Sequence, residues 1–428
     1  MEQYIEVHGG SPLRGSVAVQ GAKNSALPIL AASVLTGGVT VLENCPQLRD
    51  VEATKAILEE IGCSVGGQNG ILTVDSSGLF GYHISVEHMS ALRASIVFLG
   101  ALLARCGRAE LSLPGGCALG TRPIDIHLWA LQKLGAQIDC SGGRLTACVP
   151  RGVGCELVLP VPSVGATENI LLFATSCAGV TTVVNAAREP EIVDLQAFLC
   201  RAGYEVTGAG TPVIRVRGGR HPLRMVRHRI LPDRIAAATW LCGAAAAGGD
   251  VTVTRVIPSH LEPLTSLLRE MQCDVHVSGD AVRVRRDGPL EAIGRPVRTM
   301  PYPGFPTDMQ PLLAVPAALA RGNTLFEETV FPDRFCHAAE LVRMGAKIDV
   351  SGRFAVFHGV ETLHGADVRA TDLRCGAALV LAAAAAQGTT RIACPAYIDR
   401  GYESVENVLT SLGAQLRRCG STEKYRSH

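Results

Sequence analysis

This sequence is poor in features that mark several common classes of protein. Aromatic residues make up 4% of its 428 residues, and lysine plus arginine number 40 against 39 aspartates and glutamates. That balance does not support a broad basic surface for nucleic acid or anionic lipid, so any anion site must be local. The longest apolar run, about a dozen residues from Cys375 to Ala386, is shorter than the ~18 expected of a membrane span.

Motifs of several catalytic classes are missing as well. The chain has no Walker A motif, no GxGxxG opening a βαβ unit, no GxSxG and no HExxH, which excludes the usual nucleotide hydrolases, dehydrogenases, serine hydrolases and zinc proteases. Its 15 cysteines include no CxxC pair. This argues against a structural zinc site or a disulfide framework and favours a reducing cytoplasm. The first residues, MEQYIEVHGG, are acidic and lack an apolar core, so a cleaved signal peptide is not expected.

What the chain does contain is a long internal repeat. A stretch rich in alanine and leucine, then a glycine, then a β-branched run recurs six times, about 70 residues apart. The glycines are Gly37, Gly107, Gly179, Gly248, Gly322 and Gly388. A second marker, an amphipathic segment ending in Leu-Gly-Ala or a relative, also occurs six times, with Gln272 in place of glycine in the fourth copy.

Both markers predict a helix that ends at a glycine with positive φ and is followed by a short strand. The alanine-rich helices are apolar nearly all round, so we expect them to be buried. The simplest assembly places three units around a shared core, twice. The alternative, a doubly wound sheet with accidental similarity, is disfavoured because two markers each match six times.

Two segments of the first half are candidates for binding or catalysis. Lys23 and Asn24 open the first apolar helix, where free N–H groups and a lysine favour phosphate; a capped helix with a solvated lysine is the alternative. The loop 113–123 holds three glycines and two prolines together with Cys117 and Arg122. A thiol in such a loop near an arginine is a candidate reactive cysteine, although a loop can also tolerate an inert one. Asp125 then begins a helix, where it could simply complement the helix dipole.

The second half contributes acids and arginines at helix entries. Asp308 and Asp233 each follow a proline and are most simply N-caps, but Asp308 could act as a general base if a hydroxyl reaches it. Four arginines recur at strand-to-helix junctions. A converging anion site is one interpretation, and solvated side chains are the other. These arginines are Arg93, Arg334, Arg374 and Arg400.

Segments distributed along almost the whole chain resemble one enzyme family, the UDP-N-acetylglucosamine 1-carboxyvinyltransferases, which are enolpyruvyl transferases related to EPSP synthase. The matching segments are GAKNSALPIL, LRASIVFLG, LPGGCALGTRPIDIH, PSVGATENI, NAAREPEIVDL, LPDRI, FPTDMQ, ATDLR and YIDRGYE. The resemblance implies an α/β fold, a two-domain inverted α/β barrel of six repeats of about 70 residues. It also implies a discontinuous catalytic-half domain, residues 1–22 plus 232–428, and an inserted domain, residues 23–231, that carries the PGGC lid loop.

The activity implied by the resemblance is the first committed step of bacterial peptidoglycan synthesis. The enolpyruvyl group of phosphoenolpyruvate moves to the 3′-hydroxyl of UDP-N-acetylglucosamine through a tetrahedral ketal, and phosphate is released. The family uses no metal or organic cofactor. A cytoplasmic location, roles in cell shape and cell division, and sensitivity to fosfomycin follow from the resemblance, with no nucleic-acid or membrane partner.

The resemblance also suggests a role for individual residues. Cys117 would protonate C3 and be able to form a covalent thioether, and Asp308 would be the base near the sugar hydroxyl. Lys23 and Arg400 would be catalytic and hold phosphate. The phosphoenolpyruvate site would comprise Lys23, Asn24, Arg122, Arg334, Arg374 and Arg400. The UDP-N-acetylglucosamine site would comprise Asn24, Arg93, Arg122, Pro123, Ile124, Asp125, Ile126, Ser163, Val164, Gly165, Asp308 and Val330.

Two alternatives to this activity stay open, one of them because the chain departs from the family pattern. The departures are Val161, Pro332, Asp333, Ala236 and Tyr397. A catalytically inactive paralogue that only binds the UDP-sugar is one alternative, because fold does not guarantee activity. The other is the sister enzyme that acts on shikimate 3-phosphate, which typically lacks the loop thiol. Phosphate release with each acceptor discriminates among the three.

Overall fold

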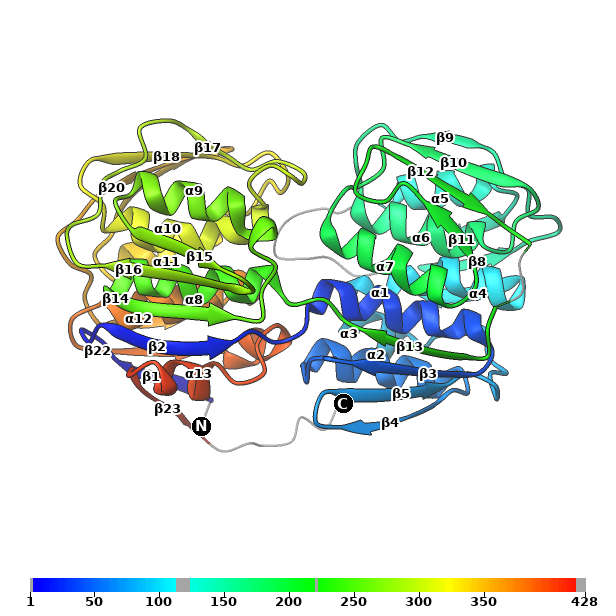
Figure 1. Ribbon diagram of the computed structural model, residues 1–428, viewed down its shortest axis with the longest axis horizontal. Helices are drawn as coiled ribbons and strands as arrows, with labels where there is room; N and C mark the ends of the chain where they lie inside the picture. The colour runs from blue at the N-terminus through cyan, green and yellow to red at the C-terminus, as the bar shows by residue number, and fades with distance from the viewer. Residues whose placement is uncertain (1–2, 113–123, 220–221, 421–428) are drawn as a thin grey trace. The chain divides into compact units, whose positions relative to one another are not determined.

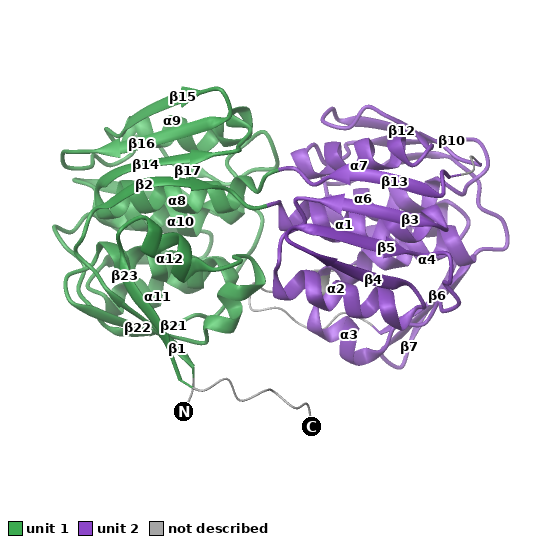
Figure 2. Ribbon diagram, turned by 60° about the horizontal axis from the view of Figure 1, so that its bottom comes forward, with its two compact units in different colours: residues 1–20, 118–120, 232–428 green, residues 21–117, 121–231 purple. Residues whose placement is uncertain are grey.

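The computed structural model describes residues 3–112, 124–219 and 222–420, without the side chain of Arg93. These residues form two compact units (Figure 2). Unit 1 contains the described residues up to Gln20 and from Pro232 onward, and unit 2 contains those between Gly21 and Leu231. Each unit has its own apolar core. The prediction of a two-domain α/β chain with two cores is confirmed.

The strands of unit 1 form three open sheets in which one parallel pair is followed by antiparallel neighbours (Figure 1). The strands are β1 (Tyr4–His8), β2 (Leu13–Ala18), β14 (Gly249–Thr254), β15 (Asp274–Ser278), β16 (Ala281–Arg286), β17 (Val297–Arg298), β18 (Asn323–Glu327), β19 (Lys347–Ser351), β20 (Phe354–His358), β21 (Asp367–Arg369), β22 (Thr389–Ala393) and β23 (Gln415–Cys419). Their orders are β2-β14-β16-β15, β17-β18-β20-β19 and β21-β22-β1-β23. The N-terminal strand β1 thus completes the sheet of the last repeat.

Unit 2 repeats the same plan. Its strands are β3 (Val39–Glu43), β4 (Ser64–Gln68), β5 (Ile71–Asp75), β6 (Arg108–Ser112), β7 (Gln137–Ser141), β8 (Arg144–Cys148), β9 (Glu156–Val158), β10 (Val180–Val184), β11 (Glu205–Thr207), β12 (Val213–Arg217) and β13 (Met225–Arg229). The orders are β13-β3-β5-β4, β9-β10-β12-β11 and β6-β8-β7. In the three-stranded sheet, a single parallel bridge from His83 to Glu110 stands where the others have a fourth strand.

Helices fall into an inner and an outer set. The inner helices are α1 (Lys23–Ser33), α4 (Phe98–Cys106), α6 (Val164–Ala174), α8 (Arg234–Ala247), α10 (Gln310–Ala318) and α12 (Leu373–Ala385). The others are α2 (Arg49–Glu60), α3 (Val86–Ala91), α5 (Asp125–Lys133), α7 (Pro190–Arg201), α9 (Glu262–Glu270), α11 (Cys336–Arg343) and α13 (Val405–Ser411), with the 3₁₀ turns η1 (Val34–Thr36), η2 (Arg93–Val97), η3 (Pro258–Leu261), η4 (Thr307–Met309) and η5 (Pro395–Arg400). Within the described ranges, no helix combines the length and apolar character needed to cross a bilayer.

The inner helices owe their burial to small residues. In α12 every residue from Leu373 to Ala384 is buried, and α8, α10 and α12 pack on one another. A side chain at Gly243 of α8 would lie 3.1 Å from Leu381 of α12, so the close approach of these two helices depends on that glycine. The expectation that the alanine-rich helices are buried is confirmed.

The repeat markers also have the predicted backbone. All six glycines of the first marker adopt positive φ, between 59° at Gly37 and 100° at Gly322. In the second marker, Gln272 adopts a φ of 69° where the other five copies place a glycine. Glycine takes this conformation without the steric cost that a Cβ atom imposes.

We therefore expect Gln272→Gly to raise the free energy of unfolding by about 1 kcal/mol, because it removes left-handed strain from an exposed turn. Urea denaturation measures the change. Gly413→Gln makes the opposite exchange at the sixth copy, where the nearest atom to an added Cβ is 4.0 Å away, and should destabilise. An unchanged midpoint for both variants would contradict the interpretation.

Candidate active site

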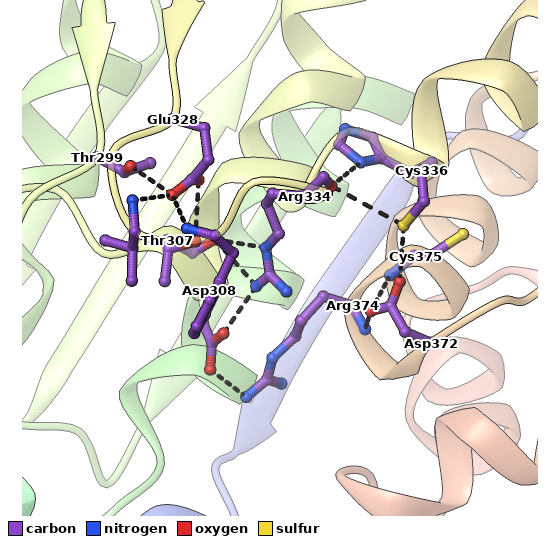
Figure 3. Close-up of polar contacts among 12 residues, drawn as sticks. Thr299, Thr307, Asp308, Glu328, Arg334, Cys336, Asp372, Arg374 and Cys375 are labelled. Carbon is purple, nitrogen blue, oxygen red and sulfur yellow. Dashed lines mark hydrogen bonds and ion pairs between the residues drawn. The ribbon is translucent and has the colours of Figure 1, made fainter. Parts of the chain in front are cut away.

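Asp308, Arg334 and Arg374 form a charged cluster in unit 1 (Figure 3). Arg334 Nη2 lies 2.7 Å from Asp308 Oδ1, and Arg374 Nη2 lies 3.0 Å from Asp308 Oδ2. The arginine side chains are only 1% and 6% exposed, whereas that of Asp308 is 27% exposed. One carboxylate thus bridges two guanidinium groups, and these three side chains together carry one net positive charge.

Each member of this cluster is positioned by local backbone structure. Asp308 lies in η4, after an extended Pro306. Arg334 donates from Nε and Nη2 to the Thr307 carbonyl, at 3.1 and 3.0 Å, and so binds the backbone as well as the side chain of the same turn. Arg374 is the second residue of α12, whose N-cap, Asp372, accepts hydrogen bonds from the amides of Arg374 and Cys375.

The simplest expectation for Asp308 was wrong. Pro306 is the N-cap of η4 and Met309 that of α10, so Asp308 caps neither helix and binds guanidinium groups. For Asp233 the simple expectation holds, since it caps α8 by accepting from the amides of Ile235 and Ala236. Both acids follow a proline at a helix entry, so only the arginines that the fold brings to Asp308, Arg334 of the same repeat and Arg374 of the next, distinguish the two.

The pKa of Arg374 is set by its burial and by the charged and polar groups around it. Burial by itself would lower the pKa of Arg374, but the negative charge of Asp308, together with Tyr402 and Asp233, raises it on balance. Tyr402 packs edge to face on Trp240 and pairs with Thr239 at 2.7 Å. The guanidinium is therefore permanently charged and held from several sides.

Sequence reasoning missed the acid that holds this region together. Glu328 is 1% exposed. Its Oε1 accepts from Thr299 Oγ1 and from the amides of Val330 and Phe331, and its Oε2 accepts from Thr307 Oγ1. One carboxylate thereby ties Val330 to the turn that carries Asp308. The signal available in the sequence was weak, a second glutamate at the end of a strand.

Arg400 ends η5, which packs against the start of α12. A Cβ at Gly376 would lie 2.6 Å from Ile398 Cγ1, and one at Gly401 would lie 2.7 Å from Leu373 Cδ2. These close approaches place the Arg400 segment beside the helix turn that presents Arg374. Of the four arginines grouped by sequence, the structure thus brings Arg334, Arg374 and the Arg400 segment into one region, while Arg93 begins η2 in unit 2.

In unit 2, Lys23 begins α1 and its Nζ lies 2.9 Å from Asp50 Oδ2, in the first turn of α2. The two side chains are 11% and 4% exposed. The alternative of a solvated lysine is therefore wrong. Asn24 follows Lys23 in α1 and is half-buried. Asp50 is a second residue that sequence reasoning missed.

The starts of α5 and α6 come together in the same unit. Ile124 precedes α5, and Asp125 and Ile126 are its first residues. Ser163 caps α6 by accepting from the Ala166 amide, and Val164 and Gly165 follow it. A Cβ at Gly165 would lie 2.9 Å from His127 Cε1 of α5, so a glycine is required for this approach. Two helix N-termini thus lie side by side, and backbone amides at helix N-termini can bind an anion.

Some predicted site residues lie outside the described residues, namely Cys117, Arg122 and Pro123, together with the side chain of Arg93. Among the described cysteines, burial raises the pKa of Cys63 and Cys177 to about 12 and that of Cys273 to about 11. These thiols are thereby kept in the unreactive protonated form. Within the described ranges, no group of three or more His, Cys, Asp or Glu side chains could hold a metal ion.

A half-buried acid in α6, Glu168, makes a pH-dependent contribution to stability. Burial, with Glu191 and Glu189 nearby, raises the pKa of Glu168 to about 8. Between the ordinary glutamate pKa of ~4.3 and this value, the folded protein binds a proton that the unfolded chain releases, so stability falls as pH rises through that window.

We expect Glu168→Gln to raise the melting temperature more at pH 8 than at pH 5, because glutamine needs no proton to remain neutral. Thermal melts at the two pH values test this, and Glu156→Gln, on an exposed position of β9, controls for the loss of a surface charge. An equal shift at both pH values would contradict the assignment.

Comparison with known proteins places these residues in context. A family model described as EPSP synthase (3-phosphoshikimate 1-carboxyvinyltransferase) matches residues 7–409. A UDP-N-acetylglucosamine 1-carboxyvinyltransferase 2 from Caldanaerobacter subterraneus is 47% identical and aligns over 97% of this chain and 99% of its own length. A UDP-N-acetylglucosamine 1-carboxyvinyltransferase 1 from Symbiobacterium thermophilum is 48% identical over 97% and 95%.

Solved structures show the same architecture. The enolpyruvyl transferase NikO from Streptomyces tendae superimposes with a TM-score of 0.89 at 28% identity, over 97% of this chain and 99% of its own. An EPSP synthase from Acinetobacter baumannii gives 0.74 at 20% identity, over 98% and 100%, a likeness of fold alone.

Proposed function

This chain belongs to the EPSP synthase family of enolpyruvyl transferases, and we propose that its acceptor is UDP-N-acetylglucosamine. The proteins that share 41–48% of its sequence are named for that acceptor. The reaction moves the enolpyruvyl group of phosphoenolpyruvate to the 3′-hydroxyl of the sugar and releases phosphate, which is the first committed step of peptidoglycan synthesis. With its free thiols, the protein would act in the cytoplasm.

The observation that carries the proposal is the carboxylate of Asp308 held between two buried guanidinium groups. Arg334 and Arg374 carry two positive charges against the single negative charge of the carboxylate that bridges them, and buried guanidinium groups favour an anionic ligand. Phosphoenolpyruvate supplies both a carboxylate and a phosphate. The partly exposed Asp308 would accept the proton of the sugar hydroxyl, for which a positioned carboxylate is suited.

The bonds of the reaction define what the remaining residues must do. The sugar oxygen bonds to C2 of the enol while C3 gains a proton, and the resulting ketal then loses phosphate from C2 and a proton from C3. We assign the protonation of C3 to Cys117. Lys23, Arg122 and Arg400 would hold the phosphate, with Asn24 beside them. Their charges would stabilise the departing anion.

The nucleotide would be bound by helix ends. The N-termini of α5 and α6, with Asp125 and Ser163 among their residues, offer free amides of the kind that bind a diphosphate. Val330, which Glu328 holds in place, would contact the sugar. We assign Arg93, Pro123, Ile124, Ile126, Val164 and Gly165 to the same UDP-sugar site.

A phosphate-release assay tests the proposal. We expect release with phosphoenolpyruvate and UDP-N-acetylglucosamine together and with neither alone, because phosphate leaves only after the sugar has added to the enol. Release with shikimate 3-phosphate in place of the UDP-sugar would assign the chain to the sister activity. No release with either acceptor would refute catalysis.

We expect Cys117→Ser to lower kcat by at least about a hundredfold, because a serine hydroxyl is a far weaker acid than a thiol. The same assay measures it. An epoxide phosphonate such as fosfomycin should alkylate Cys117 before any other cysteine, as peptide mapping would reveal. Prior labelling of an exposed thiol such as Cys140, Cys148 or Cys200, or full activity in the serine variant, would contradict the role.

A further inference from the structure

Two cysteines that the proposed reaction does not use lie beside the arginine cluster. Cys336 is the first residue of α11 and Cys375 the third residue of α12. Figure 3 shows both side chains at the starts of these helices, next to Asp372. Cys375 is 1% exposed, and Cys336 is partly accessible.

The two thiols contact each other and the cap of α12. Cys336 Sγ lies 3.0 Å from Asp372 Oδ2, while Asp372 Oδ1 accepts the amides of Arg374 and Cys375. The sulfurs of Cys336 and Cys375 also share a hydrogen bond, which lowers the pKa of the Cys375 thiol and raises the pKa of Cys336. Cys375 is therefore the more acidic of the two thiols, it lies at a helix N-terminus, and Cys336 is in contact with it as a resolving partner.

Each thiol lies within two residues of an arginine of the charged cluster. Arg334 precedes Cys336 by two residues, and Arg374 immediately precedes Cys375. Both guanidinium groups bind Asp308, at 2.7 and 3.0 Å. A change in the separation of the two sulfurs therefore acts on the backbone that positions both arginines.

We propose that Cys336 and Cys375 form a reversible disulfide when the protein meets hydrogen peroxide, and that closing it lowers the transferase activity. The activity part rests on the proposed function. The sulfur of Cys375 attacks one peroxide oxygen, the O–O bond breaks, and a sulfenic acid and water form. The sulfur of Cys336 then displaces the sulfenic oxygen as a second water. The thiols lose two electrons and two protons, and the peroxide gains them.

Formation of the disulfide would displace the backbone that positions Arg334 and Arg374. A disulfide holds its sulfurs about 2.05 Å apart, closer than two thiols in hydrogen-bond contact, so the starts of α11 and α12 must shift toward each other. Cys336 also stops donating to Asp372, which loosens the cap before Arg374. A displacement of about 1 Å in a positioned catalytic group costs up to roughly a hundredfold in rate, so we expect a tenfold or larger loss.

The test uses the full chain treated with hydrogen peroxide. We expect non-reducing peptide mapping to find the peptides of Cys336 and Cys375 joined, and phosphate release to fall at least about tenfold and to return with dithiothreitol. Cys375→Ser should keep its basal activity and lose much less of it to peroxide than the parent. Cys148→Ser, at an exposed thiol of β8, should behave like the parent.

Three results would overturn the proposal: no joined peptide, a joined peptide with unchanged activity, or equal sensitivity of Cys375→Ser and the parent, which would assign the loss to another thiol such as Cys117. If Cys375→Ser does not fold, Cys336→Ser takes its place. If the reduced parent releases no phosphate at all, the proposed function fails, and the peptide map alone then decides whether the disulfide forms.

Discussion

Asp308→Asn should lower kcat for phosphate release by about a thousandfold, the middle of the range seen when a positioned general base is removed. Asparagine keeps the shape and one accepting oxygen but cannot take up the proton of the sugar hydroxyl. Its amide group also presents N–H toward one of the two guanidinium groups, which themselves only donate. Catalysis therefore loses both the base and the bridge between Arg334 and Arg374.

The same change should destabilise unit 1. Removing the carboxylate leaves the guanidinium groups of Arg334 and Arg374, at 1% and 6% exposure, without the anion that bridges them. Breaking a fully buried pair costs about 3–5 kcal/mol, and because Asp308 is partly exposed we expect about 2–3 kcal/mol. Added phosphoenolpyruvate should recover part of this loss, since an anion would replace the missing charge.

Steady-state phosphate release and urea denaturation measure the two effects. Asp333→Asn is the matched control, because it makes the same chemical change at an exposed acid one residue before Arg334. It should leave both quantities near those of the parent. Parent-like kcat in Asp308→Asn would remove Asp308 from the mechanism, and parent-like stability would show that the buried arginines are neutralised by another group.

Glu328→Ala should cost about 3–5 kcal/mol of stability, a large effect for one side chain. Four donors lose their acceptor: the hydroxyls of Thr299 and Thr307 and the amides of Val330 and Phe331. Each unsatisfied buried donor costs about 1–3 kcal/mol, and local relaxation lowers the sum. Because Val330 and the Asp308 turn are both released, we also expect a higher KM for the UDP-sugar and a lower kcat.

The conservative variant separates geometry from charge. Glu328→Gln keeps one accepting oxygen, and Thr307 can reverse its hydroxyl to accept from the new amide, so most of the stability and KM should return. Glu327→Ala is the control, since the neighbouring glutamate pairs with the exposed Arg298 at 2.7 Å. A loss in Glu327→Ala as large as that in Glu328→Ala would show that the effect belongs to strand β18 in general.

Much of the architecture was predictable because local sequence patterns that recur along the chain specify it. An apolar segment followed by a glycine and a β-branched run predicts a helix, a turn with positive φ and a strand. Six copies at a constant interval then predict where one repeat ends and the next begins. Sequence did not indicate that β1 completes the sheet of the last repeat or that β13 pairs with β3. Strand pairing between distant segments leaves no local trace.

The candidate site was predictable in part, and for a different reason. A helix entry such as that of Asp308 has the same sequence pattern whether its acid caps the helix or binds arginines. The resemblance to enolpyruvyl transferases predicted a base at Asp308, but its contacts with Arg334 and Arg374 were not anticipated. Lys23 was identified as a helix-start cation, but its partner Asp50 lies 27 residues away and carries no motif. Glu328 and the contact between Cys336 and Cys375 were not anticipated.

The repeat, the burial of the alanine-rich helices and the family follow from the sequence alone, because periodicity, side-chain size and long ordered motifs are properties of the chain taken along its length. Which charged side chains come into contact depends on the folded structure. Arg334 and Arg374 come from different repeats and share one carboxylate only because their helices start beside the turn that holds Asp308, and electrostatic energy depends on distance in space rather than along the chain.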